Sequence, residues 1–321
     1  MRGLKKVAGI VAMAVMLMGN VALAAESGTA SEEIVPKVND GTKIVINLAS
    51  RGLYLYEQGV TTRLYPIACG KPSDPTPVGY YTVIEKEVNP IWRDSRSGEV
   101  VYSGPDNPLG YRWISFRPYY GIHGTNNPDS IGSFASRGCI RMHEQDVEEL
   151  YERVEVGTPV EIFYNRVVVE KAPDGTVTYY IYPDTYERQP ITVAQVNEWL
   201  HGFGVECFES DEAIAAKIEA EDGQPTYVAK PYSIQLNGQM MAFKAVEKNG
   251  ECYLPAVAMA EALNIPIFYD RDNEVAVTCY STAPVSVFKD VLYINAAYAG
   301  KLLHLGGGTA DKAGLIYYTM K

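Results

Sequence analysis

The chain contains Ile122-His123-Gly124-Thr125, followed closely by Ser136-Arg137-Gly138-Cys139-Ile140-Arg141. A histidine thus precedes a cysteine by 16 residues, and a glycine stands directly before the cysteine. A cysteine nucleophile needs a base that takes its proton and backbone N–H groups that hold an oxyanion. A lone Cys/His pair is more often a buried thiol beside a chance histidine, but the added Gly and Arg residues reverse that preference. We therefore interpret Cys139 as the nucleophile and His123 as its base.

The residues next to the cysteine indicate where a substrate would bind. Gly138 has no side chain, so backbone amides can approach a reacting carbonyl. Arg137 and Arg141 can each hold a carboxylate through paired hydrogen bonds. For Arg141, a structural role at the rim of the loop is supported as well as a role in substrate binding. Ser136 opens the same loop and completes the candidate oxyanion and substrate site.

Length and charge limit the classes of protein that need to be considered. The chain has 321 residues, 47% of them hydrophobic, which is enough for two ordinary cores. Its formal net charge of −11 argues against a nucleic-acid-binding protein. No Cys-x-x-Cys pair occurs, so neither a zinc site nor a thioredoxin-like motif is expected.

The first residues have the pattern of an export signal. Basic residues open the chain, Ile10–Leu17 is apolar, and Ala22-Leu23-Ala24 is a small-x-small cleavage site. This pattern predicts a signal peptide over residues 1–24 and export to the periplasm or cell wall. A single membrane anchor is the alternative, although the apolar stretch is short for a span. A polar linker is expected over residues 25–41.

Export affects how the cysteines are interpreted. Five cysteines cannot all pair with one another, and Cys139 is the one expected to remain a free thiol. Cys252 and Cys279 lie in one C-terminal segment and could form a disulfide. Equally, Cys69, Cys207 and these two residues could be buried thiols that pack as small hydrophobic side chains.

Short apolar stretches separated by turn residues predict a mainly β domain over residues 42–166. The expected strands cover residues 43–48, 52–56, 64–70, 80–84, 112–116, 121–123 and 160–164. After the cysteine, Val147, Leu150 and Val154 have helical spacing. The pattern predicts a helix that starts near His143, with Glu144 and Asp146 at its positive end, and that braces the loop of Cys139.

A second, smaller α+β domain is expected after the β domain. Residues 167–224 are predicted to form a connector, with a hairpin over 167–181 and helices over 193–200 and 211–220. The helix at 193 has Thr192 as its expected N-cap. The acidic, turn-forming run Glu221–Pro225 then separates the connector from the C-terminal domain, 225–321. Within that domain we expect a strand and turn over 233–238, a helix over 256–263 and a strand over 274–280.

The motifs of the β domain resemble those of the L,D-transpeptidases of the YkuD fold. The two stretches around His123 and Cys139 carry the resemblance, and three further motifs occur in the family's order: Thr76-Pro77-Val78-Gly79, Asn89-Pro90-Ile91-Trp92 and Asn107-Pro108-Leu109-Gly110. Most members of the family have a second histidine where this chain has Arg137. The resemblance covers roughly residues 42–164 and implies a β-sandwich with one bracing helix.

The resemblance also implies a reaction on the stem peptides of peptidoglycan, without a cofactor. The thiolate of the family's cysteine attacks the carbonyl of a diaminopimelate at its L-centre, the terminal D-residue leaves, and a thioester forms. An amine of a second stem peptide then takes the acyl group, which gives a 3→3 crosslink that contributes to wall synthesis and cell shape. Transfer to water would instead make the protein an L,D-carboxypeptidase.

The family's roles transfer to matching positions of this chain. Cys139 would be the nucleophile and His123 the base, and the carbonyl of Gly124 would orient the imidazole. The amides of Arg137, Gly138 and Cys139 would form the oxyanion hole.

The C-terminal domain is similar to the copper amine oxidase N-terminal-like, or stalk, domain of bacterial surface proteins. The residues that carry this similarity are Leu236-Asn237-Gly238, Leu254-Pro255, Ala260-Glu261-Ala262-Leu263 and Tyr269-Asp270. We expect no copper, because His201 and His304 are far apart in sequence. The similarity implies a spacer or cell-wall contact. A shortened chain that ends near Pro183 is therefore expected to keep the chemistry.

Three other classes of protein are alternatives. Sortase-type transpeptidases also order their residues His, Cys, Arg, but with much wider spacing and with Thr before the cysteine. Papain-like hydrolases place the cysteine before the histidine. A wall-binding protein with an inert catalytic domain stays open because of Arg137, although the intact His123, Gly138 and Cys139 argue against it.

Overall fold

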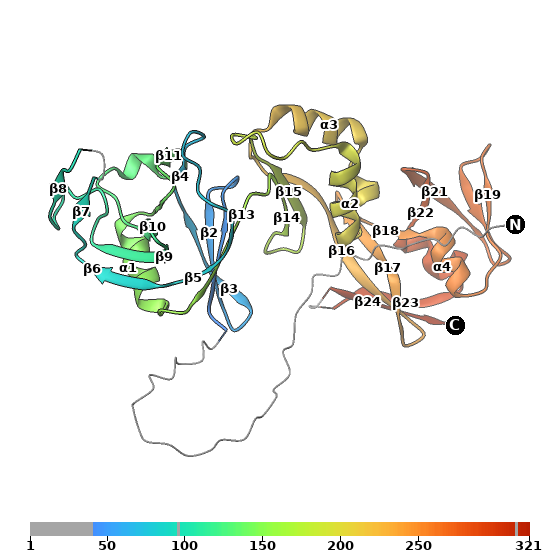
Figure 1. The fold of residues 1–321 in the computed structure, drawn as a ribbon. Helices are drawn as coiled ribbons and strands as arrows, with labels where there is room; N and C mark the ends of the chain where they lie inside the picture. The colour runs from blue at the N-terminus through green and yellow to red at the C-terminus, as the bar shows by residue number, and fades with distance from the viewer. Residues whose placement is uncertain (1–40, 95–96, 312–313) are drawn as a thin grey trace, which may run out of the picture. The chain divides into compact units, whose positions relative to one another are not determined.

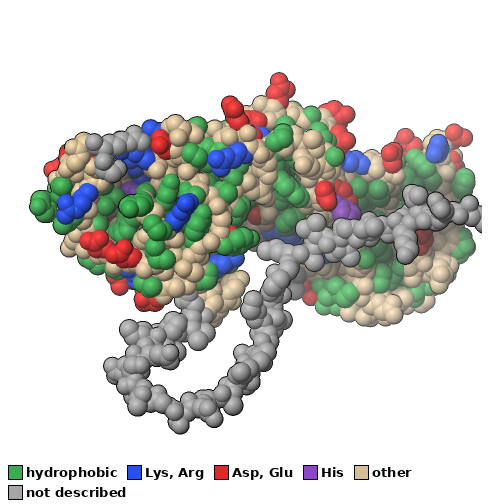
Figure 2. All heavy atoms as spheres, viewed as in Figure 1, with side chains coloured by type: hydrophobic (Ala, Val, Ile, Leu, Met, Phe, Trp, Pro, Cys, Tyr) green, Lys and Arg blue, Asp and Glu red, His purple; other side chains and the backbone are tan. Residues whose placement is uncertain are grey.

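The computed structural model describes residues 41–94, 97–311 and 314–321 (Figure 1). The predicted signal peptide and almost all of the predicted linker lie outside these residues. Within the described ranges, no helix combines the length and the apolar character needed to cross a membrane. On the face drawn in Figure 2, Lys and Arg side chains are scattered among acidic and hydrophobic ones.

The N-terminal domain is built on a five-stranded sheet with the order β3-β2-β1-β13-β5. Strand β1 pairs antiparallel with β2 and parallel with β13, so that Ile44 lies opposite Val160. This pairing joins the two ends of the domain. The strands are β1 (Lys43–Asn47), β2 (Gly52–Glu57), β3 (Val60–Pro66), β5 (Gly79–Thr82) and β13 (Pro159–Phe163).

A four-stranded sheet with the order β12-β10-β9-β6 forms the other layer. Its strands are β6 (Glu85–Val88), β9 (Arg112–Arg117), β10 (Tyr120–His123) and β12 (Ile140–Arg141). Two small ladders flank it: β4 (Cys69–Gly70) with β11 (Phe134–Ser136), and β7 (Trp92–Arg93) with β8 (Val100–Val101). A 3₁₀ turn, η1 (Pro128–Ser130), precedes β11.

One core connects both sheets and the predicted helix, α1 (Glu144–Arg153). Val147, Leu150 and Val154 are fully buried in it, together with Ile44 from the first sheet and Ile114 from the second. Figure 1 shows α1 beside β9 and β10. The expected β-rich domain with one bracing helix is confirmed.

The connector contains the predicted hairpin, β14 (Val167–Lys171) and β15 (Val177–Ile181), and both predicted helices. Helix α2 (Val193–Phe203) begins after Thr192, whose side chain forms a capping box with Gln195. A 3₁₀ turn, η2 (Glu206–Phe208), separates it from α3 (Asp211–Ala220). The predicted N-cap residue Thr192 therefore starts α2 through local hydrogen bonds.

The hairpin also belongs to the C-terminal sheet, because β15 pairs with β16 (Thr226–Leu236). The expected boundary at Gln224 therefore falls inside one continuous sheet. The remaining elements, in which strands dominate, are β17 (Gln239–Lys248), β18 (Glu251–Pro255), α4 (Ala256–Ala262), β19 (Phe268–Asp270), β20 (Val275–Val277), β21 (Thr282–Phe288), β22 (Val291–Asn295), η3 (Ala296–Tyr298), α5 (Ala299–Leu302), β23 (Leu305–Ala310) and β24 (Leu315–Met320).

A connector residue completes the core of the N-terminal domain. Tyr186 is 9% exposed and stacks on Tyr164 with ring centroids 5.1 Å apart. Its hydroxyl donates to the Gly70 carbonyl at 2.5 Å. A chain that ends near Pro183 would lack this side chain. The core therefore extends beyond the expected end of the β domain at residue 166, at least to Tyr186.

Removing the Tyr186 ring should destabilise the N-terminal domain. We expect Tyr186→Ala to lower the free energy of unfolding by about 3–5 kcal/mol, because it empties a buried aromatic site. Tyr186→Phe, which removes only the hydroxyl, should cost about 1 kcal/mol. Urea unfolding of the full chain measures both, with the 65%-exposed Tyr227→Ala as the control. Equal losses at Tyr186 and Tyr227 would contradict this account of the core.

Candidate active site

The candidate site is assembled by the parallel pairing of β10 with β12. In this register Ile122 lies opposite Ile140, and His123 lies opposite Arg141. Side chains alternate between the two faces of a strand, so the buried isoleucines point into the core on one face. His123 and Arg141 share the other face, and Cys139 directly precedes β12. The structure thus brings together the residues that the sequence separates by 16 positions.

His123 is 4% exposed and is held by its own backbone. Its Nδ1 lies 2.6 Å from the Gly124 carbonyl oxygen, which can only accept a hydrogen bond. Nδ1 therefore carries the proton, and Nε2 offers a lone pair. Burial lowers the pKa of His123 to about 4, an effect that the hydrogen bond to Gly124 opposes and the charge of Arg141 reinforces. The imidazole is therefore neutral at neutral pH.

Trp113 covers the histidine from the neighbouring strand. The two rings stack with centroids 5.6 Å apart, and Trp113 lies opposite His123 in the β9–β10 register. A Cβ on Gly121 would come within 2.6 Å of the indole. Gly121 therefore provides the space that lets Trp113 cover His123, a requirement that the sequence analysis did not identify.

Cys139 is a protonated thiol at neutral pH in this arrangement. Its Sγ lies 3.7 Å from the Tyr119 carbonyl oxygen and donates to it. Burial raises the pKa of the Cys139 thiol, while a hydrogen bond from the Gly121 backbone and the charge of Arg141 act in the opposite direction. The resting site thus contains a neutral thiol and a neutral imidazole rather than a thiolate and an imidazolium.

The loop before Cys139 is closed by Ser136, which is 2% exposed. Its hydroxyl donates to the Cys139 carbonyl at 2.6 Å and accepts from the Gly138 N–H at 3.0 Å. The Gly138 amide, expected among the oxyanion donors, is therefore bonded to Ser136 here. Gly138 has φ +105°, and a Cβ there would lie 2.6 Å from the ring of Tyr120. Both facts require glycine at this position.

The two arginines of the motif have different partners. Arg137 Nη1 contacts the Asp94 carboxylate at 3.2 Å, which connects the Cys139 loop to the β7–β8 hairpin. Arg141 Nη1 donates to the Ser130 hydroxyl of η1 at 3.3 Å. Arg141 therefore has a structural contact, as one of its two expected roles requires.

Two of the supporting motifs are structural. Asn107 is fully buried, donates to the Pro90 carbonyl at 2.7 Å and accepts from the Leu109 N–H at 2.8 Å. Thr76 is also fully buried, and its hydroxyl accepts from the Gly70 N–H at 2.9 Å. These bonds fold the loops that surround the Cys139 segment.

A cleft of ≈ 380 Å³ opens at the thiol. Its wall is largely aromatic and aliphatic, with one acidic and one basic residue. The lining residues are Glu87, Pro90, Ile91, Trp92, Arg93, Leu109, Trp113, Tyr119 and Cys139. Such a cleft can bind a peptide through its apolar walls and orient it through its two charges.

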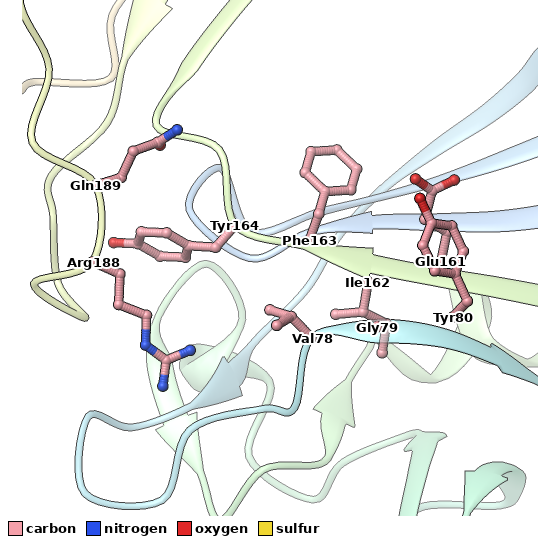
Figure 3. Close-up of a pocket in the computed structure, with 9 residues that line it drawn as sticks. All are labelled: Val78, Gly79, Tyr80, Glu161, Ile162, Phe163, Tyr164, Arg188 and Gln189. Atoms are coloured by element: carbon pink, nitrogen blue, oxygen red, sulfur yellow. The ribbon is translucent and has the colours of Figure 1, made fainter. Parts of the chain in front are cut away.

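A second cavity of ≈ 390 Å³ lies along β5 and β13 (Figure 3). Figure 3 shows Tyr164, Arg188 and Gln189 on one side of it and Val78 on the other. Neither His123 nor any residue of the Cys139 loop lines this cavity. This second cavity is therefore separate from the cleft at Cys139.

The other cysteines and histidines lie apart from the site. All five cysteines are within the described ranges, and all are free thiols, including Cys252 and Cys279. His201 contacts Glu206 at 2.8 Å, and His304 stacks on Tyr280. Within the part of the chain that the structure describes, no group of three or more His, Cys, Asp or Glu residues could hold a metal ion.

Comparisons with known proteins show the family to which the chain belongs. Residues 41–162 match the YkuD family model, described as an L,D-transpeptidase catalytic domain. The L,D-transpeptidase homologue YqjB of Bacillus subtilis is 39% identical over 123 residues, which cover 36% of this chain and 68% of YqjB. This chain belongs to the L,D-transpeptidase family. The homologue YkuD of Bacillus subtilis is 34% identical over 157 residues, 47% of this chain and 87% of that protein.

Other relatives are matched over less of their length. The chain spans 64% of the homologue YkuD of Bacillus licheniformis and 48% of the homologue YbiS of Escherichia coli. The NMR structure of the catalytic domain of the E. faecium L,D-transpeptidase is 30% identical. That match covers 39% of this chain and 98% of the solved one, with a TM-score of 0.33.

Gly138 should be intolerant of a side chain for two separable reasons. We expect Gly138→Ala to destabilise the domain more than Gly132→Ala, which has a similar φ of +85° but open space around it. Backbone strain should cost both variants about 1–2 kcal/mol, and the contact with Tyr120 should add to the loss only at Gly138. Urea unfolding compares the two. Equal losses would show that the Tyr120 contact is unimportant.

The reactivity of Cys139 should increase steeply with pH. Burial raises its pKa above the ordinary 9.0, so the thiolate fraction should grow about tenfold per pH unit from pH 6 to 9. We expect iodoacetamide labelling of the Cys139 peptide, followed by mass spectrometry, to show this increase without a plateau below pH 9. A plateau that begins below pH 7 would indicate a thiolate–imidazolium pair and contradict the neutral site.

Proposed function

We propose that this protein is a cysteine-dependent peptidoglycan L,D-transpeptidase that forms 3→3 crosslinks between stem peptides. One observation supports the proposal: Cys139 directly precedes β12, which pairs with the strand that ends at the buried, oriented His123, and Cys139 lines a cleft of ≈ 380 Å³. Membership of the L,D-transpeptidase family supports the same reaction class.

In the first half of the reaction, Sγ of Cys139 attacks the carbonyl carbon of the donor peptide's diaminopimelate. Nε2 of His123 takes the thiol proton as the C–S bond forms, because the Gly124 carbonyl keeps the proton of the ring on Nδ1. The C–N bond to the terminal D-residue then breaks, and His123 returns the proton to the departing amine. A thioester on Cys139 remains.

Backbone amides would stabilise the tetrahedral oxyanion. Because the Gly138 N–H bonds to Ser136, we assign this role to the amides of Arg137 and Cys139. An oriented donor of this kind contributes about 3 kcal/mol to the transition state. Formation of the oxyanion could also draw the Gly138 amide away from Ser136 and add a third donor.

In the second half, the amine of an acceptor stem peptide attacks the thioester carbonyl. His123 takes a proton from this amine, the new C–N bond forms, and the thiol leaves with the proton. Attack by water would give an L,D-carboxypeptidase, which is the competing outcome. The apolar walls formed by Trp92 and Trp113 suit an acceptor stem peptide, which on binding would displace water from the thioester.

The charges of the cleft match the diaminopimelate side chain, which ends in an ammonium and a carboxylate. Glu87 offers a partner for the ammonium, and Arg93 one for the carboxylate. Arg141 supports the rim of the site through its hydrogen bond to Ser130. We also propose that the chain works outside the cytoplasmic membrane after export, and that the C-terminal domain is stalk-like and holds the enzyme on the wall.

Loss of either reacting side chain should abolish or strongly slow acylation. We expect Cys139→Ala to give no adduct with a carbapenem and no crosslinked product. His123→Ala should slow acylation by about 10²–10⁴-fold, the usual range for an oriented base. Stopped-flow fluorescence and muropeptide mass analysis measure these effects.

His143→Ala is the matched control, because His143 only precedes α1 and its side chain makes no capping hydrogen bond there. A larger defect in His143→Ala than in His123→Ala would show that His123 is not the base. Normal crosslinking by Cys139→Ala would overturn the proposed function. Product released only by hydrolysis would favour the carboxypeptidase.

A further inference from the structure

Glu144, the first residue of α1, has its carboxylate between two glycines of the site. A Cβ on Gly124 would overlap Oε2 of Glu144, and so would a Cβ on Gly110. Each glycine thus leaves the space that the carboxylate fills. Gly124 is therefore needed for two reasons. Its carbonyl binds His123, and its lack of a side chain leaves space for the carboxylate of Glu144 from α1.

The carboxylate is bound to backbone amides on both sides. Oε1 of Glu144 accepts from the Tyr111 N–H at 2.8 Å. On the other side, Oε2 lies against Gly124, and the backbone N–H of Thr125 lowers the pKa of the carboxylate, against the larger effect of burial, which raises it. Glu144 therefore connects the loop that ends at Gly110 with the segment that follows His123.

The Thr125 N–H and the Gly124 C=O belong to one peptide group. The oxygen of that group accepts the hydrogen bond from Nδ1 of His123 at 2.6 Å. A continuous path therefore runs from the Glu144 carboxylate through one peptide to the imidazole. Hydrogen bonds in such a chain polarise one another, so the carboxylate makes the peptide oxygen a better acceptor.

We propose that Glu144 is a positioning residue that acts on His123 through the Gly124–Thr125 peptide. It holds the peptide plane, selects the Nδ1–H tautomer and stabilises the imidazolium that forms when Cys139 is deprotonated. This role in the reaction rests on the proposed function, but the effect on the tautomer does not. The arrangement corresponds to the carboxylate that orients histidine in Ser-His-Asp sites, with one peptide group inserted.

A simpler explanation is that Glu144 only stabilises the start of α1. Asp146 separates the two explanations, because it is an acidic residue in the same first turn of the helix. Arg112 and Glu148 also influence Glu144 electrostatically, and Arg141 influences His123. These residues stay in place in both test variants.

The experiment compares Glu144→Gln with Asp146→Asn in the full chain. Nitrogen NMR of ¹⁵N-histidine-labelled protein reports the tautomer of His123, and mass spectrometry reports the rate of acylation by a carbapenem. We expect Glu144→Gln to weaken the Nδ1–H signature and to slow acylation by about 10–100-fold, the range for partners that orient a functional side chain. Asp146→Asn should change neither readout.

A folded Glu144→Gln variant with the wild-type tautomer and rate would overturn the proposal, and so would equal effects at Asp146. If Glu144→Gln does not fold, Glu144→Asp replaces it in the experiment. This variant keeps the charge but has a shorter side chain, and we again expect a weaker Nδ1–H signature and slower acylation. If the wild-type protein is not acylated, the proposed function fails, while the tautomer still tests the effect of Glu144 on His123.

Discussion

The site depends on the parallel pairing of β10 with the two-residue strand β12. This register places Ile122 beside Ile140 in the core and His123 beside Arg141 on the opposite face. A shift of β12 by one residue would turn Arg141 and Cys139 to the face of the isoleucines, away from His123. The hydrophobic core therefore fixes the geometry of the chemistry, because the isoleucines that stabilise the sheet also set the positions of the reacting residues.

Burial keeps the thiol and the imidazole neutral, and the Gly124 carbonyl orients the imidazole. The Gly124 carbonyl determines the tautomer of His123, and burial disfavours the charge of both side chains. In the proposed reaction, proton transfer from Cys139 becomes favourable only when a substrate carbonyl provides a developing oxyanion for the loop to hold. Such a site limits indiscriminate reaction of the half-buried thiol.

Much of this site could be predicted from the sequence because its signals are local. The spacing of Val147, Leu150 and Val154 predicted α1, and Thr192 predicted the start of α2. Each signal involves only residues that are close together in the sequence. Strand β12 is too short to have a pattern. The joining of β1 to β13 is a long-range contact that periodicity does not encode.

The surroundings of three side chains could not be predicted from the sequence for the same reason. Glu144 resembles an ordinary acidic residue at a helix start, and only the folded chain shows it between Gly110 and Gly124. Tyr186 lies beyond the expected domain boundary, yet its hydroxyl bonds to Gly70 in the core. The function of Ser136 in closing the Cys139 loop likewise depends on a turn that φ +105° at Gly138 makes possible.

The most direct test of this account is the intact mass of the protein after brief reaction with a tetrapeptide stem that ends in a D-residue. The account predicts a covalent adduct equal to the tripeptide acyl group, located on the Cys139 peptide and removed by hydroxylamine, as a thioester should be. An adduct on any other residue, or a crosslinked product formed without an adduct on Cys139, would contradict it.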